Sequence, residues 1–207
     1  MESFVEIQNW GFNALILSAL MTVVFSIFQC YGFVMQGRKI FKEKSVEAIS
    51  PAMFFLFLFY FIAFAYYGVE KRSLAMTLNG LLFIPVIPIV FGIFKFKDKI
   101  VFTDIILFVL TMMIVPAMVL IENKDILLSL LLVINLGALV SQLLAIIKNK
   151  GAGAVEIKFI IIFTVTSFFW LIYAIGIQNY PLICFNSAAL VVYLIIILLY
   201  RKYLPKK

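Results

Sequence analysis

The chain has 207 residues, of which 65% are hydrophobic and 23 are phenylalanine. Soluble domains are usually about 45–50% apolar, so this excess indicates an integral membrane protein. The net charge of +7 comes from short clusters between apolar runs, which is typical of membrane topology and argues against a nucleic-acid-binding protein. Histidine is absent and neither cysteine belongs to a metal-binding pattern, so we expect no enzyme, no metal site and no cofactor.

Apolar runs of about the 20 residues that a membrane-spanning helix needs recur along the whole chain. In chain order they cover about 11–35, 51–69, 74–94, 100–121, 126–147, 157–177 and 181–200. The connections are short, so neighbouring helices must be antiparallel. The sequence therefore predicts an all-α membrane protein with seven transmembrane helices.

The basic residues predict the orientation of these helices. Fourteen of the 17 Lys and Arg residues fall in the connections and tail on one side, and 3 (Lys71, Arg72 and Lys124) fall on the other. Cytoplasmic connections carry the excess of Lys and Arg. We therefore expect a multi-pass protein of the cell membrane, with its N-terminus outside and its C-terminus in the cytoplasm.

The chain also repeats itself. Gln36 and Gln142 are 106 positions apart, and so are Tyr67 and Tyr173. Asn79 and its counterpart in the second copy are 107 positions apart, which we attribute to an outer loop that is one residue longer in the second copy. The pattern predicts two parallel three-helix repeats, 1–97 and 123–207, joined by a linker helix within 98–122, which is a 3+1+3 arrangement.

Several short motifs recur in the same order in both repeats. The first repeat has "MQGRKIFKEKS", "FAYYG" and "TLNG", and the second has "SQLLAIIKNKGAGAVEI", "WLIYA" and "CFNS". This set resembles the SWEET sugar transporters and the wider PQ-loop family. The resemblance implies a 3+1+3 membrane transporter of sugars, and it is compatible with a homo-oligomer, such as a homotrimer.

The chain departs from the family pattern in its prolines. The proline of the Pro-Gln pair is replaced by Met35 in the first copy and by Ser141 in the second. Of the prolines that bend helices 1, 2, 5 and 6 in the family, Pro51 alone remains. Helices 3 and 4 instead contain Pro85, Pro88 and Pro116. Pro51 is thus a candidate gating residue, and other hinges are expected elsewhere.

Four residues from four helices are predicted to share one layer, roughly 8 Å below the outer face. They are Asn79, Asn186, Phe64 and Trp170. Pseudo-two-fold symmetry would bring each pair face to face. Amides offer donors and acceptors for hydroxyl groups, and an indole stacks on a sugar ring. We interpret the layer as a binding site for a neutral sugar, and the two large aromatic residues favour one of monosaccharide size.

Each of these residues also has a structural interpretation. A lone asparagine in a membrane helix commonly makes a hydrogen bond between helices. Tyr67 and Tyr173 fit either an outer gate or an interfacial aromatic belt. Gln36 and Gln142 either cap the inner ends of their helices or line the inner mouth as gating residues.

The acidic residues bear on energy coupling. All ten lie in loops or near helix ends. Asp104 alone falls within a predicted membrane span, near the inner end of helix 4. Proton coupling usually needs a carboxylate inside the membrane. We therefore predict passive, bidirectional transport of a sugar by alternating access. The alternatives are a facilitator of another small neutral solute, such as a vitamin, nucleoside or amino acid, and a cargo receptor that transports nothing.

Overall fold

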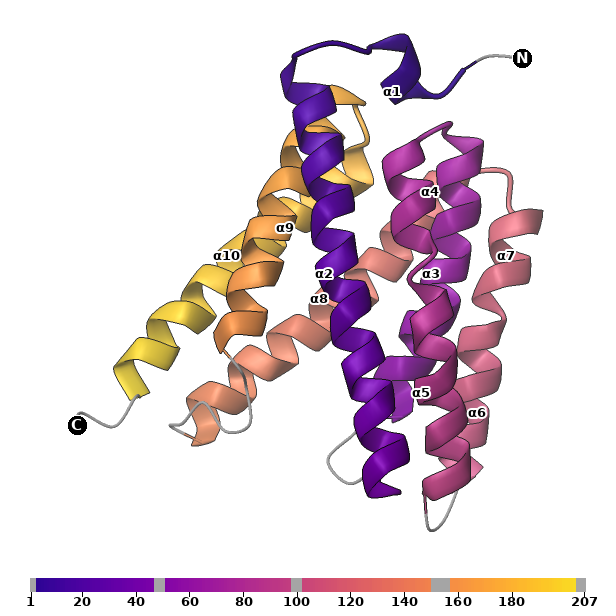
Figure 1. Ribbon diagram of the computed structural model, residues 1–207, viewed down its shortest axis with the longest axis vertical. Coiled ribbons are helices and arrows are strands. Elements are labelled where there is room, and N and C mark those ends of the chain that lie inside the picture. Colours follow the sequence, from indigo (N-terminus) through magenta and orange to yellow (C-terminus); the bar gives the residue numbers. More distant parts are fainter. Residues whose placement is uncertain (1–2, 47–50, 98–101, 150–156, 204–207) are drawn as a thin grey trace. The chain divides into compact units, whose positions relative to one another are not determined.

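The computed structural model describes residues 3–46, 51–97, 102–149 and 157–203, and every regular element among them is a helix (Figure 1). The all-α prediction is therefore confirmed. Internal contacts divide the chain into two units. Unit 1 holds residues 1–8 and 23–124, and unit 2 holds residues 9–22 and 125–207.

The predicted helices agree closely with the observed ones, except that the third and fourth are each interrupted. The helices that begin in the first repeat and the linker are α1 (Val5–Gln8), α2 (Ala14–Glu43), α3 (Pro51–Glu70), α4 (Leu74–Gly80), α5 (Phe83–Phe96), α6 (Phe102–Met112) and α7 (Ile114–Leu120). They are followed by α8 (Lys124–Asn149), α9 (Ile157–Gly176) and α10 (Tyr180–Tyr203). Helix α2 is continuous, but its first turns belong to unit 2 and its remainder belongs to unit 1.

Prolines account for the two interruptions. Pro85 is the third residue of α5, and Pro116 is the third residue of α7. A proline has no N–H to donate, and its ring clashes with the carbonyl four residues earlier. Those carbonyls belong to Leu81, in the break between α4 and α5, and to Met112, the last residue of α6. Pro51, in contrast, is the first residue of α3, a position at which no intrahelical hydrogen bond is lost.

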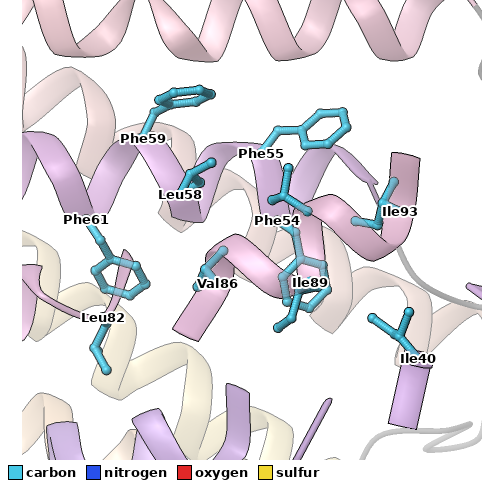
Figure 2. Packing of buried hydrophobic residues seen from close by; sticks show 11 residues of the cluster. Ile40, Phe54, Phe55, Leu58, Phe59, Phe61, Leu82, Val86, Ile89 and Ile93 are labelled. Carbon is cyan, nitrogen blue, oxygen red and sulfur yellow. The ribbon is translucent and has the colours of Figure 1, made fainter. Parts of the chain in front are cut away.

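Helix α3 lies at the centre of unit 1 and contacts α4, α5, α6 and α7. Its phenylalanines form a hydrophobic core with side chains from α5 and α2. Figure 2 shows the buried residues of this core. Phe55 of α3 stacks on Phe94 of α5, with ring centroids 5.4 Å apart, and meets Phe108 of α6 edge-on at 5.1 Å. The linker α6–α7 is thus part of unit 1 and packs against α3.

Glycines bring α3 and α4 into close contact. A Cβ atom on Gly80 would lie 2.4 Å from the backbone of Ala65, and one on Gly68 would lie 2.5 Å from the backbone nitrogen of Thr77. Real Cβ atoms do not approach other atoms so closely. Small residues at helix interfaces allow this kind of backbone approach in membrane proteins. The two glycines therefore fix the position of α4 on α3.

In unit 2, α9 and α10 pack along each other. Their buried contact includes Ile160 and Ile196, and α8 adds Leu139 and Leu143 to it. The first helix contributes at the other end, where the side chain of Leu15 lies against Gly176. Unit 2 is therefore completed by residues from the beginning of the chain.

Among the described residues, five helical segments are long and apolar enough to cross a membrane. They are Ala14–Glu43, Met53–Glu70, Leu74–Phe96, Phe102–Leu120 and Tyr180–Lys202, and the apolar helix Ile160–Gly176 is shorter. Many large hydrophobic side chains on these helices are exposed, such as Phe102 and Leu110 of α6, and such side chains are suited to lipid. These features support a multi-pass membrane protein, and the count of seven spans stays a prediction.

Candidate functional site

The turn after α3 and the turn after α9, which the sequence predicts to lie on the outer side, have the same backbone conformation. Arg72 and Gln178 both adopt the left-handed conformation, with φ of 52° and 55°. In each turn the next residue, Ser73 or Asn179, donates its N–H to the carbonyl five residues earlier, at 2.8 and 2.9 Å. Each residue of the second turn follows its counterpart by 106 positions. The repeat inferred from the sequence thus extends to backbone geometry.

The same residues begin the next helix in both repeats. The Ser73 hydroxyl accepts the N–H of Met76 at 3.0 Å, and the Asn179 side chain accepts the N–H of Leu182 at 3.1 Å. Both are standard N-caps that satisfy a backbone donor in the first helical turn. The two outer loops therefore have equal length, and the expectation of a longer loop in the second copy is wrong.

The extra residue lies inside the helix instead. Asn79 is six positions after its cap, whereas Asn186 is seven positions after its own. One residue turns an α-helix by about 100°. Measured from the caps, Asn79 corresponds to Phe185 and Asn186 to Gly80, so the two amides are not symmetry equivalents.

Asn79 lies in unit 1, is 6% exposed and is held by helix α2. Its amide nitrogen donates to the Ser26 hydroxyl at 2.7 Å and to Oε1 of Gln29 at 3.5 Å. Its Oδ1 accepts no hydrogen bond from the described residues. Every fully buried polar side-chain atom in the described part of the chain has a partner, so this oxygen must reach open space. Ser26 shares one face of α2 with Ser18 and Thr22, because successive members are four residues apart. The contact of Ser26 with Asn79 was not predicted from the sequence.

Asn186 lies in unit 2, is 3% exposed and is held differently. Its amide nitrogen donates at 2.8 Å to the carbonyl of Leu182 in its own helix. One of its two N–H bonds and its Oδ1 are not used by the described residues. This amide therefore keeps both a donor and an acceptor, whereas Asn79 keeps an acceptor.

An aromatic pair accompanies each asparagine in its unit. Phe64 and Tyr67 are stacked with centroids 6.4 Å apart, and Trp170 meets Tyr173 edge-on at 5.8 Å. All four are less than 9% exposed, and both tyrosines are fully buried. Burial is not expected of residues that belong to a lipid-facing aromatic belt, so it favours the gate interpretation of the tyrosines.

The remaining candidates lie on α2, α3 and α8. Gln36 is half-buried in the last third of α2, and Pro51 opens α3. Gln142 lies within α8, and its side chain is outside what the structure describes.

Two acidic residues are buried among the described ones, and both have partners. Asp104 forms an ion pair with Lys97 at the beginning of α6. Glu6, which the sequence gave no reason to single out, accepts hydrogen bonds from the first turn of α4. Within the described ranges, no three Cys, Asp or Glu side chains lie close enough together to hold a metal ion.

The comparisons with known proteins agree with these observations. Residues 125–207 match the family described as "Sugar efflux transporter for intercellular exchange". The fold matches a solved structure described as "The 3.7 A resolution structure of a eukaryotic SWEET transporter", with a TM-score of 0.73 and 15% sequence identity, over 92% of this chain and 96% of that one. No curated protein sequence matches the chain. The resemblance predicted from the motifs is confirmed.

Proposed function

We propose that this chain is a carrier of the SWEET type, whose family model its residues 125–207 match, and not an enzyme. In this proposal it moves a monosaccharide-sized sugar passively, in either direction, across the plasma membrane by alternating access. One observation carries the proposal. Each repeat buries an asparagine and an aromatic pair on corresponding helices, with no charged side chain among them.

The amides supply the polar contacts that a sugar needs. Asn79 offers Oδ1, and an acceptor of this kind takes a hydrogen bond from a sugar hydroxyl. Asn186 offers a donor and an acceptor, so it suits a hydroxyl that both gives and receives. We expect the two ends of the sugar to be recognised differently.

The aromatic residues supply the apolar contacts and limit the size of the site. Trp170 presents an indole face suited to the C–H side of a sugar ring, and Phe64 takes the corresponding position in the first repeat. Both side chains are large and almost completely buried. We propose that two rings of this size leave room for a monosaccharide and not for a disaccharide.

Gating residues are proposed at both ends of the path. Tyr67 and Tyr173 come three residues after Phe64 and Trp170, towards the predicted outer side. Both tyrosines are fully buried, as a closed outer gate requires. Gln36 and Gln142 are assigned to the inner gate with Pro51 at the beginning of α3.

The acidic residues support transport without proton coupling. Asp104 is neutralised by Lys97 near a helix end, and Glu6 is occupied by the backbone of α4. A proton-coupled carrier instead needs a carboxylate that can load and release a proton along the path.

Uptake of radiolabelled glucose into proteoliposomes tests the proposal. The native chain is compared with the Asn79→Ala/Asn186→Ala double variant, with and without a proton gradient. We expect saturable flux that ignores the gradient and is lost in the double variant. Flux of another neutral solute in place of sugars would make the protein a facilitator of that solute. Ligand binding without any flux would make it a receptor.

A further inference from the structure

A buried carboxylate joins the N-terminal segment to the helix that carries Asn79. Glu6 of α1 is 6% exposed. Its Oε2 accepts the N–H of Leu74 at 2.9 Å, and its Oε1 accepts the N–H of Ala75 at 3.0 Å. The Ser73 hydroxyl also donates to Oε1 at 3.3 Å. We refer to residues 3–8 as the N-terminal strap.

The backbone of the strap is attached beside the same helix end. The N–H of Val5 donates to the carbonyl of Arg72 at 2.8 Å, in the turn just before α4. A negative charge at a helix N-terminus is also favoured by the helix dipole. The strap therefore binds α4 through one backbone bond, three bonds to Glu6 and a favourable charge.

Glu6 completes the cap of α4. The first turn of a helix leaves its N–H groups without intrahelical partners. In α4 those of Leu74 and Ala75 are taken by Glu6, and that of Met76 is taken by Ser73. Without Glu6, the buried N–H of Ala75 and the partly buried N–H of Leu74 would lose their partner.

The second repeat does not need such a carboxylate at the corresponding position. The residue 106 positions after Ala75 is Pro181, which has no N–H to satisfy. Helix α10 is also continuous over 24 residues, whereas α4 has 7 residues and ends at the break before α5. A short helix depends far more on what holds its two ends.

Asn79 is the sixth residue after the cap, about 9 Å along the helix axis. The close approach of Gly80 to Ala65 holds the inner end of α4, and the strap holds its outer end. We propose that Glu6 is a positioning residue for transport: by fastening α4 it sets the place of the Asn79 amide. This inference rests on the proposed function.

The test compares Glu6→Ala and Glu6→Gln with Gln8→Ala, a control on the same helix whose side chain bonds to Ser3 within the strap. Glutamine keeps one acceptor oxygen, so Glu6→Gln should have the smaller effect. In proteoliposomes we expect Glu6→Ala to raise the KM for glucose about tenfold, as for a lost hydrogen bond to a charged group, while Gln8→Ala leaves it unchanged. Glu6→Ala combined with Asn79→Ala should raise KM no further than Asn79→Ala alone.

Hydrogen exchange of the reconstituted protein gives a readout that does not depend on sugar transport. Exchange in the peptide covering 74–80 should increase in Glu6→Ala and stay unchanged at the beginning of α10. An unchanged exchange rate in this peptide would overturn the claim that the strap fastens α4. This result can be obtained even if the native chain transports no sugar. Increased exchange with an unchanged KM would overturn the positioning role, and a fall in maximal rate alone would assign Glu6 to stability.

Discussion

The candidate site residues are held asymmetrically, although the sequence predicts two copies of one repeat. The sequence identified Asn79, Asn186 and their aromatic companions because polar residues stand out in apolar helices. It could not predict that Asn79 donates across to α2 while Asn186 donates to its own helix. That difference depends on side-chain orientation, and one residue of offset within a helix changes it by about 100°.

The contact between Ser26 and Asn79 leads to a first prediction. Ser26→Ala should weaken sugar binding about fivefold, because a hydrogen bond worth about 1 kcal/mol that orients the amide is lost. The effect is measured as KM for glucose uptake. Ser18→Ala is the control, since that hydroxyl bonds to carbonyls of its own helix. Ser26→Ala is also made in a chain that already carries Asn79→Ala. If Ser26→Ala raises KM by the same factor there as in the native chain, the two residues act separately.

The size of the site leads to a second prediction. Phe64→Ser removes a large buried ring and should allow a disaccharide to be transported alongside glucose. Competition of glucose uptake by sucrose measures this change. Phe91→Ser, on a ring that is 58% exposed, should leave the preference as it is. An unaltered size preference in Phe64→Ser would count against Phe64 as part of the site.

At the scale of elements, the lengths of the apolar runs predicted where the helices lie. They did not predict where two of the helices are interrupted. The interruption after Gly80 and the one at Met113 come from prolines that sit three residues into the following segment. Hydrophobicity is continuous across both breaks, so a count of apolar residues joins the two parts. The positions of Pro85 and Pro116 could have predicted the two breaks. The sequence analysis instead treated these prolines as departures from the family pattern.

The contact of α4 with α3 gives a third prediction. Gly80→Ala should lower the free energy of unfolding by about 1–3 kcal/mol, because the new Cβ would overlap the backbone of Ala65. Thermal unfolding in detergent micelles measures the loss. Gly32→Ala is the matched control, since nothing lies within 4 Å of its added Cβ and the change removes a helical glycine. If both variants unfold together, the close packing of α4 on α3 is not a source of stability.

At the scale of the whole molecule, the order of weak motifs was enough to show a resemblance to the SWEET family, which the family match over residues 125–207 supports. The structural comparison supports the fold. The direction in which the chain crosses the membrane rests on the distribution of Lys and Arg. That distribution reflects how helices are inserted, which is a property of the membrane as well as of the protein.

A fourth prediction concerns this orientation. With Cys30 and Cys184 replaced by alanine, Glu122→Cys should react from outside intact cells with a maleimide that cannot cross the membrane. Lys42→Cys should react after the cells are permeabilised. Both positions are exposed, so the label can reach either one. The reverse pattern would invert the topology.

Helix α2 has a consequence for biosynthesis. Its first turns are made early, yet their packing partners in unit 2, such as Gly176 against Leu15, leave the ribosome near the end of translation. Contacts between distant parts of a chain form slowly because a long loop must close. The beginning of the first helix must therefore stay without these packing partners until the last two helices have been made. For the same reason, the second repeat made alone would lack part of its own core.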